Sequence, residues 1–335
     1  MTLKVLAAGD HFVRNDLLID ALKSAVPGEL DVRELTLPWP VVPFGPVGEV
    51  DEASDVEDEL IEALRGVEVC VTQMAPLTKR VLDASPDLRL FCVSRGGPVN
   101  ANLKAASEAG VKVTFAPGRN AVATAEHTLA MLLAATRRIP QTHMELKGGA
   151  WRSDYYSYDQ VGPELDGNTV GLIGYGAIGS RVARMLEGFG ANVLVYDPYV
   201  DAPGTVGLRE LLERSLFVSL HARATPETAG MIGAAEIAAM PKGSVLVNCA
   251  RGALLDYDAL CDALESGHLF GAACDVFPDE PIPPGSRLLT APNLVMTPHL
   301  AGASKETAKK AAEIVAADVA RYVRGEPIAH LANPS

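Results

Sequence analysis

Three features that would indicate other classes of protein are scarce in this sequence. Basic residues do not dominate: 29 Lys and Arg stand against 42 Asp and Glu, giving a formal net charge of −13 at pH 7, whereas a nucleic-acid-binding protein needs a basic face. The five cysteines are scattered, without the C-x-x-C pairs of zinc or redox sites. No apolar run approaches the roughly 18 residues that cross a bilayer, and residues 1–10 lack the apolar core of a signal peptide. We therefore expect a reduced, cytoplasmic protein that holds no metal and binds neither nucleic acid nor membrane.

Length and composition suit a two-domain globular protein. The chain has 335 residues, of which 48% are hydrophobic and 21% are charged, which is typical of a folded chain rather than a disordered one. At about 150 residues per domain, this length predicts two domains. Two domains also suit an enzyme that works in a cleft.

The stretch at 169–198 carries the most specific motif. An apolar run is followed by a glycine loop and a helical pattern, which is the order of strand, loop and helix in a dinucleotide-binding unit. In such a unit the first glycine allows a tight turn, the second lets the backbone approach a pyrophosphate, and the third lets the helix pack closely on the strand. We predict a helix over 177–189 that ends at Gly190. The cofactor-binding positions of the loop are Gly174, Tyr175, Gly176, Ala177, Ile178 and Gly179.

The residue that ends the next strand distinguishes between the two nicotinamide cofactors. The strand expected at 192–196 is followed by Asp197, 18 residues after Gly179 (197 − 179), close to the roughly 20-residue offset at which a carboxylate binds the adenosine ribose. Its charge would repel the 2′-phosphate of NADP, and neither Arg nor Lys occupies the next three positions. The expected cofactor is therefore NAD.

The N-terminal third alternates between strand and helix patterns. A proline-rich loop at 37–48 interrupts the alternation, and its Trp39 and Phe44 either close over a ligand or pack on their own domain. The domain is expected to end at Gly118, and a helix at 304–324 to pack back on it, so that its predicted extent is 1–118 and 303–335. Strands are predicted at 4–8, 30–35, 68–72, 88–94 and 111–115, with helices at 15–25, 56–65, 79–84 and 103–109.

The remaining residues, 119–302, form the second predicted domain. An apolar helix is expected at 123–138, with His127 as a hydrogen-bonded interior residue rather than a base. Six parallel strands, the number in a complete dinucleotide-binding domain, follow from two strands around the glycine loop and four later ones. The later strands are predicted at 216–220, 244–249, 271–276 and 293–297.

Ionisable side chains follow three of these strands at their carboxyl ends, where doubly wound sheets bind their ligands. The three are Arg251, Glu280 and His299. Hydride transfer to a carbonyl leaves an alkoxide that needs a proton, which a histidine donates and recovers near neutral pH. A carboxylate fixes the histidine tautomer, and the rigid fork of an arginine holds a substrate carboxylate. Structural alternatives stay open: a capping ion pair for Arg251, a solvated loop acid for Glu280 and a helix N-terminal residue for His299.

A second ligand-binding position is predicted in the N-terminal domain. Ser94, Arg95, Gly96 and Gly97 follow a predicted parallel strand, and the glycine pair exposes backbone N–H groups at the sheet edge. They are the candidate cradle for the anionic end of a substrate, and a simple turn is the alternative. The segment Asp10-His11 ends a strand at the same edge, and its histidine is interpreted as a surface residue.

The chain resembles the D-isomer-specific 2-hydroxyacid dehydrogenase family. The matching segments are VGLIGYGAIG at 170–179, VNCARG at 247–252, CDVFPDEP at 274–281 and TPHLAG at 297–302. The resemblance implies two doubly wound parallel-sheet α/β domains, a flavodoxin-like substrate domain that is discontinuous in sequence and a Rossmann NAD-binding domain, with homodimerisation through the latter. It implies Arg251 as substrate anchor, Glu280 and His299 as the acid/base pair, and Asp275 as a partner of the nicotinamide amide. Further implied cofactor contacts are Cys249, Ala250 and Gly302.

Two departures from the family pattern affect the expected substrate. Arg95 lies inside the glycine loop, which motivates the hypothesis that the substrate carries a second anionic group, such as a phosphate or phosphonate. Arg223 stands near the expected cofactor path, where relatives tend to have proline. The predicted activity is the NAD-dependent interconversion of a small anionic D-2-hydroxyacid and its 2-oxoacid. The alternatives are dehydrogenation of another small oxoanion (phosphonate, phosphite or formate) and a non-catalytic NAD(H)-sensing protein like the family's corepressors.

Overall fold

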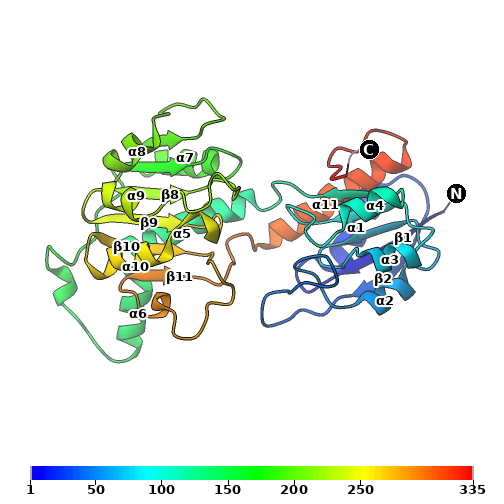
Figure 1. The fold of residues 1–335 in the computed structure, drawn as a ribbon, viewed down its shortest axis with the longest axis horizontal. Coiled ribbons are helices and arrows are strands. Elements are labelled where there is room, and N and C mark those ends of the chain that lie inside the picture. The colour runs from blue at the N-terminus through cyan, green and yellow to red at the C-terminus, as the bar shows by residue number, and fades with distance from the viewer. Residues whose placement is uncertain (1, 334–335) are drawn as a thin grey trace. The chain divides into compact units, whose positions relative to one another are not determined.

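In the computed structural model of the protein, which describes residues 2–333, the chain is divided into two compact units. Unit 1 comprises Met1–Asn120 and Ala303–Ser335, and unit 2 comprises Ala121–Gly302. Each unit contains one parallel sheet with helices on both faces (Figure 1). The predicted fold class, two doubly wound α/β sheets, is therefore confirmed.

Unit 1 is built on a five-stranded parallel sheet in the order β2-β1-β3-β4-β5, which is the flavodoxin-like order. The short strands β3 and β4 are buried at every residue, as parallel strands covered on both faces must be. The chain winds in opposite directions from β1, so a topological switch point lies between β1 and β3. The strands are β1 (Leu3–Gly9), β2 (Leu30–Thr36), β3 (Val69–Thr72), β4 (Leu90–Val93) and β5 (Lys112–Phe115).

The C-terminal helix completes unit 1. On one face of the sheet, α11 (Lys305–Val323) packs beside α1 (Asn15–Ala25), as Figure 1 shows. The other face is covered by α2 (Glu57–Ala63), α3 (Lys79–Ala84) and α4 (Leu103–Glu108). The chain after α11 lies along the edge strand, where Phe115 N–H donates to the carbonyl of His330 at 3.2 Å and Ala332 N–H donates to that of Val113 at 2.8 Å. This pairing satisfies groups that an open sheet edge would expose.

The proline-rich segment at 37–48 forms no helix or strand, as its composition predicted. Trp39 and Phe44 pack edge to face on each other, with ring centroids 5.3 Å apart, and Phe44 also packs against the apolar core of unit 1. Of the two alternatives for Trp39 and Phe44, the structure therefore shows packing on their own domain.

Unit 2 is built on a six-stranded parallel sheet in the order β11-β10-β9-β8-β6-β7. Beyond β7, Thr205 forms one isolated parallel bridge with Val195. If that segment is counted as the third strand, and β6 and β7 as the first and second, the sheet has the 3-2-1-4-5-6 strand order of a Rossmann domain. Strand β11 is then an additional strand at the opposite edge. The strands are β6 (Thr169–Ile173), β7 (Asn192–Tyr196), β8 (Phe217–Leu220), β9 (Ser244–Asn248), β10 (Leu269–Cys274) and β11 (Leu294–Met296).

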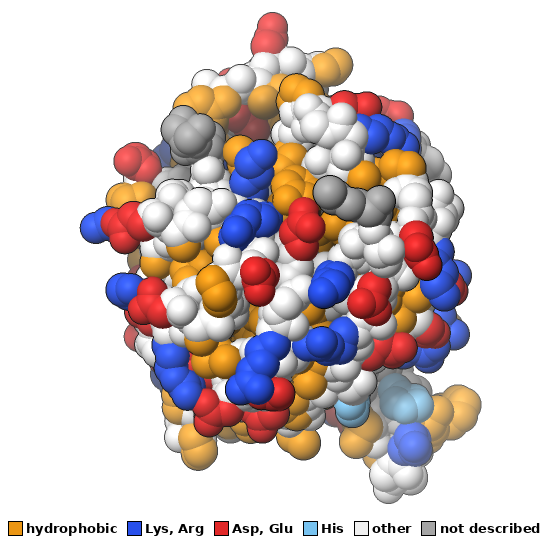
Figure 2. Space-filling view, turned by 90° about the vertical axis from the view of Figure 1, so that its right-hand side faces the viewer, with side chains coloured by type: hydrophobic (Ala, Val, Ile, Leu, Met, Phe, Trp, Pro, Cys, Tyr) orange, Lys and Arg blue, Asp and Glu red, His pale blue; other side chains and the backbone are white. Residues whose placement is uncertain are grey.

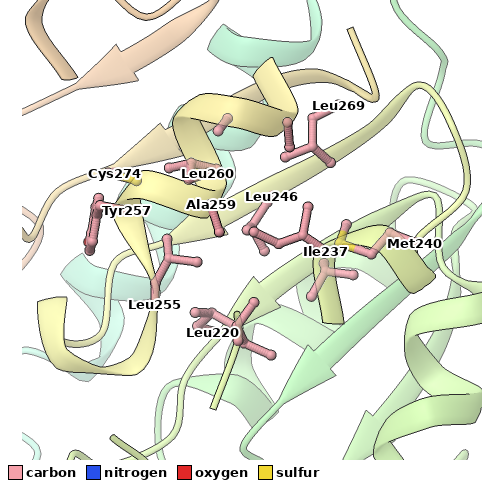
Figure 3. Close-up of a cluster of buried hydrophobic side chains, with 14 of the residues drawn as sticks. Leu220, Ile237, Met240, Leu246, Leu255, Tyr257, Ala259, Leu260, Leu269 and Cys274 are labelled. Carbon is pink, nitrogen blue, oxygen red and sulfur yellow. The ribbon is translucent and has the colours of Figure 1, made fainter. Parts of the chain in front are cut away.

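Two apolar layers cover this sheet. One joins α5 (Ala121–Thr136) and α7 (Gly179–Glu187) to the strands, and the other lies under α8 (Leu208–Arg214), α9 (Ala234–Ala239) and α10 (Tyr257–Glu265). Figure 3 shows the second layer, in which Ile237, Leu246 and Leu260 come together from α9, β9 and α10. Both layers consist mainly of aliphatic side chains, so the loops at the strand ends rest on a rigid base.

One helix of unit 2 differs in its limits from the prediction, and another was not predicted. The helix predicted at 177–189 is shorter, Gly179–Glu187, although Gly190 has the positive φ of 72° that was expected after its end. A helix that was not predicted, α6 (Ile139–Lys147), follows α5 after Arg138, whose φ of 50° breaks the helical path. None of the α6 residues is buried. Without a face that packs on this chain, the helix lacks the apolar periodicity by which a helix is recognised in a sequence.

Several features are absent from residues 2–333. None of their helices is both long and apolar enough to cross a membrane. No group of three or more His, Cys, Asp and Glu side chains in this part of the chain is arranged to hold a metal ion. The five cysteines are all buried and free of disulfides. On the side shown in Figure 2, Lys and Arg are interspersed with Asp and Glu, so this face carries no continuous charge of one sign.

Candidate active site

The glycine loop between β6 and α7 has the geometry that a bound dinucleotide requires. Gly174 has a φ of 101°, and a Cβ there would lie 2.6 Å from the carbonyl carbon of His221. A Cβ on Gly179 would lie 2.1 Å from the carbonyl oxygen of Gly174, so only glycine permits this close packing. A Cβ on Gly176, by contrast, would meet nothing within 4 Å. The loop is thus closely packed at Gly174 and Gly179 and unobstructed at Gly176. This arrangement would let a pyrophosphate approach the backbone of Gly176.

Asp197 lies at the carboxyl end of β7, next to this loop. Its carboxylate accepts hydrogen bonds from Tyr175 N–H at 2.8 Å and from Tyr199 N–H at 2.9 Å. A carboxylate has about four acceptor positions, so two such bonds leave capacity for ribose hydroxyls. These contacts fix the acid beside the loop, and the residues present fit the adenosine half of NAD.

In the segment after β9, the backbone is better suited to contact a cofactor than the sulfur of Cys249 is. Cys249 is buried, and burial raises the pKa of its thiol to about 12. The thiol therefore stays protonated near neutral pH and is a poor nucleophile. Ala250, which follows it, is partly buried, as is Gly302 at the end of unit 2.

The two expected acid/base residues are in direct contact. His299 Nδ1 lies 2.7 Å from Glu280 Oε2, and Glu280 Oε1 accepts a hydrogen bond from Phe277 N–H at 2.9 Å. The hydrogen bond to Glu280 raises the pKa of His299 above its usual value. Burial acts to raise the pKa of Glu280, but hydrogen bonds from His299 and Phe277 outweigh it and lower that pKa. The pair thus favours a carboxylate beside an imidazolium.

Arg251 is exposed beside this pair. Its positive charge opposes the protonated form of His299 and favours the ionised form of Glu280, so it lies within electrostatic range of both. Its guanidinium donates one hydrogen bond, from Nη1 to the carbonyl of Ala250 at 2.7 Å. Most of its N–H groups are therefore free to bind an anion. The structure thus brings together Arg251, Glu280 and His299, three residues that are far apart in the sequence.

A buried polar network ties the loop of Arg251 to the loop of Glu280. Asn248, the last residue of β9, donates from Nδ2 to the carbonyl of Arg251 at 2.9 Å. The same amide lies 3.2 Å from the hydroxyl of Tyr257, which donates to the carbonyl of Val276. Figure 3 shows Tyr257 at the start of α10, beside Leu255 and Cys274. Both loops are therefore positioned by one side chain from an adjacent helix, a role that no sequence pattern signalled.

Asp275 anchors the loop that carries His299. Its carboxylate is fully buried and accepts hydrogen bonds from Thr297 Oγ1 at 2.5 Å and from the N–H groups of Leu300 and Ala301 at 2.7 Å each. The N–H of His299 donates to the backbone carbonyl of Asp275 at 2.9 Å. The structure therefore gives Asp275 a positioning role that the sequence had not suggested, and its expected contact with the nicotinamide amide stays a prediction.

His127 on α5 belongs to the same cluster. Its Nε2 lies 3.0 Å from the hydroxyl of Thr297 and 3.6 Å from the carboxylate of Asp275. The prediction that His127 is hydrogen-bonded is confirmed, although its side chain is only partly buried. Thr297 links it to Asp275, so α5 supports the loop of His299 from a second direction.

The predicted substrate cradle lies in unit 1, directly after β4. A Cβ on Gly96 or Gly97 would meet nothing within 4 Å, so the backbone there is uncovered. Arg95 differs from expectation, because its guanidinium forms an ion pair with Glu52 and also donates to the Glu52 carbonyl at 3.1 Å. A neighbouring carboxylate thus already compensates the charge that had suggested a second substrate anion. Ser94 is fully buried.

Several known proteins are similar to this chain. Residues 129–301 match the family described as D-isomer specific 2-hydroxyacid dehydrogenase, NAD binding domain. The chain is 37% identical to D-3-phosphoglycerate dehydrogenase of Methanocaldococcus jannaschii over 86% of its own length and 56% of that protein, so it spans about half the length of that relative. It is 37% identical to glyoxylate reductase of Korarchaeum cryptofilum over 84% of this chain and 88% of that protein. The structure of NAD-dependent formate dehydrogenase from Staphylococcus aureus in complex with NAD is similar with a TM-score of 0.78 and 27% identity, covering 99% of each chain.

Proposed function

The chain belongs to the D-isomer specific 2-hydroxyacid dehydrogenase family, and from this premise we propose that it is an NAD-dependent oxidoreductase that interconverts a small D-2-hydroxyacid and its 2-oxoacid. The observation that carries the proposal is the hydrogen bond between His299 and Glu280, with Arg251 in electrostatic range. An imidazole whose pKa is raised by a carboxylate, next to an exposed guanidinium, is suited to protonate an oxygen on an anionic substrate.

Unit 2 carries the family's NAD-binding domain. NAD, when bound, accepts the hydride from the hydroxyacid or, in its reduced form, returns it to the oxoacid. Asp197 favours NAD over NADP, because its carboxylate would repel a 2′-phosphate. The residues that we propose to hold the cofactor are Gly174, Tyr175, Gly176, Ala177, Ile178, Gly179, Asp197, Cys249, Ala250, Asp275 and Gly302.

His299 is the proposed general acid and base. Its Nδ1 faces Glu280, which leaves Nε2 to exchange a proton with the substrate oxygen. In the direction of reduction, the imidazolium donates a proton from Nε2 to the oxygen of the former carbonyl. In the direction of oxidation, neutral Nε2 accepts the proton of the substrate hydroxyl. Glu280 holds the ring in one tautomer and stabilises the imidazolium in both directions.

The substrate is proposed to be a small anion. Arg251 binds the substrate carboxylate through a bidentate pair of hydrogen bonds, a geometry that lysine cannot provide. Gly96 and Gly97 contribute backbone N–H groups, and Ser94 and Arg95 flank them. The uncovered backbone at the two glycines supports this role.

We also propose that the protein is a homodimer formed through unit 2. The segment 139–161, which contains α6 and projects at the margin of unit 2 in Figure 1, exposes a series of large apolar side chains. Exposed apolar clusters that include aromatic residues are typical of protein interfaces. A second copy of the chain is the proposed partner. The exposed side chains are Ile139, Met144, Leu146, Trp151, Tyr156, Tyr158 and Val161.

The proposed activity is tested by following NADH absorbance with a panel of 2-oxoacids and D-2-hydroxyacids, together with formate and phosphite. We expect turnover of at least one oxoacid, and a rate reduced by roughly 10²- to 10⁴-fold in His299→Ala, the usual contribution of a general acid or base. His268→Ala, which removes a histidine between α10 and β10 at the end of the sheet opposite the site, serves as the matched control. An unchanged rate in His299→Ala would refute the assignment of His299. Turnover of formate or phosphite alone would favour the oxoanion reaction.

A further inference from the structure

The glycine loop of unit 2, which binds a pyrophosphate in the proposed function, has no basic side chain of its own. Its residues 174–179 read GYGAIG, and the carboxylate of Asp197 lies beside it, bonded to the N–H of Tyr175. The backbone N–H groups of the loop and the N-terminus of α7 attract an anion. A pyrophosphate is negatively charged on both phosphates, and arginine is the side chain best suited to compensate such charge. A residue that completes the site must therefore come from another segment.

Two basic side chains close to the loop have other roles. Arg181, in the first turn of α7, donates from Nη1 to the carbonyl of Ala177, so part of its guanidinium serves the loop itself. His221 directly follows β8, and its Nε2 lies 3.0 Å from the hydroxyl of Ser219. Burial lowers the pKa of His221 to about 4. Its imidazole is therefore neutral near neutral pH and adds no positive charge to the site.

The segment after His221 brings a third basic residue, Arg223, close to the loop. Strand β8 pairs with β6, and the N–H of His221 donates to the carbonyl of Ile173 at 2.7 Å. A Cβ on Gly174 would lie 2.7 Å from the backbone nitrogen of Ala222, so the two loops touch. The Cα of Arg223 is at most about 5 Å from that nitrogen. The side chain of Arg223 is therefore long enough to reach the loop.

The backbone at Arg223 is held in place, while its side chain is unpaired. Thr228 Oγ1 donates to the carbonyl of Arg223 at 2.6 Å and accepts a hydrogen bond from the N–H of Thr225 at 2.8 Å. Arg223 is exposed, and within residues 2–333 its guanidinium forms no hydrogen bond or ion pair. A side chain on an ordered backbone loses less conformational freedom on binding than one on a flexible loop. This arrangement favours a role in recognition.

The strand order of unit 2 places Arg223 where a dinucleotide is expected. The chain winds from β6 to β7 and then crosses to β8 on the other side of β6, so the topological switch point lies between β6 and β8. Dinucleotides bind across such a point, with the pyrophosphate at the loop after the first strand. Asp197 follows β7, which is two strand spacings, or about 10 Å, from β8. Arg223 is therefore better placed for the pyrophosphate than for the ribose hydroxyls beside Asp197.

We propose that Arg223 binds the pyrophosphate of the cofactor and supplies the positive charge that the glycine loop lacks. Its guanidinium donates to a phosphate oxygen from the side of β8, and the backbone N–H groups of the loop donate from the side of β6. This inference rests on the proposed function, which assigns NAD to unit 2, and adds a cofactor-binding residue to it. It also gives a role to a position at which this sequence departs from the family pattern.

The test is the affinity of the full-length protein for NAD, measured by titration calorimetry without substrate, so that no turnover is required. In Arg223→Gln the dissociation constant should rise by roughly three- to tenfold, the size expected for one charge-assisted hydrogen bond partly exposed to solvent. The loss should be largest at low salt and shrink as salt screens the charge. Arg223→Lys keeps the charge and should keep the salt dependence of the wild-type protein. Lys242→Gln, which removes an exposed positive charge at the opposite end of the unit 2 sheet, is the matched control and should bind NAD normally.

The outcomes separate this inference from the proposed reaction. ADP-ribose retains the pyrophosphate but lacks the nicotinamide, so its affinity should fall by the same factor in Arg223→Gln. If Arg223→Gln binds NAD as tightly as the wild-type protein does, or if its loss is equal at low and high salt, the inference is overturned and the dehydrogenase proposal stands. The expected loss of affinity in a protein that turns over no oxoacid would support the inference while the proposed reaction fails. Absence of NAD binding to the wild-type protein overturns both.

Discussion

At the scale of single residues, the candidate site depends on a hydrogen bond between two partly exposed groups. The side chains of His299 and Glu280 are 52% and 26% exposed, so solvent screens their attraction and the pair contributes little to stability. Its main effect is on protonation, because Glu280 raises the pKa of His299. With the carboxylate present, the imidazolium persists to higher pH, where reduction of an oxoacid still requires it.

Glu280→Gln should therefore shift the pH dependence of catalysis toward lower pH. Without the carboxylate the pKa of His299 falls, so kcat/KM for reduction should decline at a lower pH than in the wild-type protein. Oxidation requires neutral His299, so its acid limb should move in the same direction. The measurement is kcat/KM against pH in both directions, with Glu213→Gln on α8, an exposed carboxylate, as control. Identical profiles for Glu280→Gln and the wild type would rule out this role.

The positions of Arg251, Glu280 and His299 could be predicted because each lies three to six residues after the end of a strand with a recognisable pattern. Their supporting residues could not. Asn248 and Thr297 are polar residues at the ends of apolar strands, and local sequence does not tell whether such a side chain points to solvent or to another loop. Their roles depend on contacts with residues 9 and 22 positions away in the chain, respectively.

At the scale of elements, the loop 297–301 is held mainly by Asp275. Three donors converge on this buried carboxylate, from Thr297, Leu300 and Ala301. The loop has no regular structure of its own, and His299 within it adopts a left-handed φ of 54°, which is unfavourable for a residue other than glycine. The surrounding hydrogen bonds must offset that strain, so we infer that Asp275 determines where His299 lies.

Asp275→Asn should destabilise the protein and slow catalysis together. The amide keeps one acceptor, but its NH₂ group would face donors of the loop, and the unfolding free energy should fall by roughly 1–3 kcal/mol, the usual cost of unpairing a buried group. Urea denaturation and kcat measure the two effects. Asp279→Asn changes an exposed carboxylate in the same segment and should affect neither. Equal stability of the two variants would contradict the anchoring role.

Helix α6 is the element that the sequence did not reveal, and the reason is physical. Its apolar residues face outward, as the exposure of Met144 shows, so they follow no pattern set by the core of unit 2. A proposed second copy of the chain would supply the missing partner. Trp151, Tyr156 and Tyr158 lie in the following segment, and the two tyrosines are 92% and 91% exposed. Such exposure of large aromatic side chains is costly in water unless an interface covers them.

A charged substitution in this segment should therefore dissociate the proposed dimer. By size-exclusion chromatography with light scattering, we expect the wild-type protein at twice the chain mass of 35.3 kDa, and the double variant Met144→Glu/Trp151→Glu at the single mass. A glutamate in an apolar interface would lose its hydration without gaining a partner. Tyr199→Glu, another exposed position of unit 2, should leave the mass unchanged. A monomeric wild-type protein would refute the proposal.

At the scale of the whole molecule, the sequence predicted the layers because alternating strands and helices leave few arrangements for a parallel sheet. The limits of α1 and α3 and the number of strands in both sheets were predicted correctly. The order of the strands came from the family resemblance, since no local pattern tells which strands pair. The bridge at Thr205 was not predicted, because a single bridge leaves no periodicity.

The stability of unit 1 depends on α11, a helix near the C-terminus that packs against elements from the N-terminal part of the chain. Its inner face is fully part of the core, packed with residues of α1 and the sheet. Fully burying one valine contributes roughly 1.5–3 kcal/mol, and this helix buries two of them together with several alanines. A typical domain is stable by only about 5–15 kcal/mol in total. The buried residues of α11 are Thr307, Ala308, Ala311, Ala312, Val315, Ala316, Asp318, Val319 and Ala320.

A chain that ends at Gly302 should therefore contain an unfolded unit 1 beside a folded unit 2. Hydrogen exchange measures this directly: amides of β1 should lose their protection, while those of β6, whose covering helices all lie within unit 2, should keep it. A chain that ends at Gly325 is the matched control, because it retains α11 and loses only the segment that hydrogen-bonds to β5. Its β1 amides should stay protected. If β1 is equally protected in the chain that ends at Gly302, the core contacts of α11 are dispensable and unit 1 is held together by its N-terminal part alone.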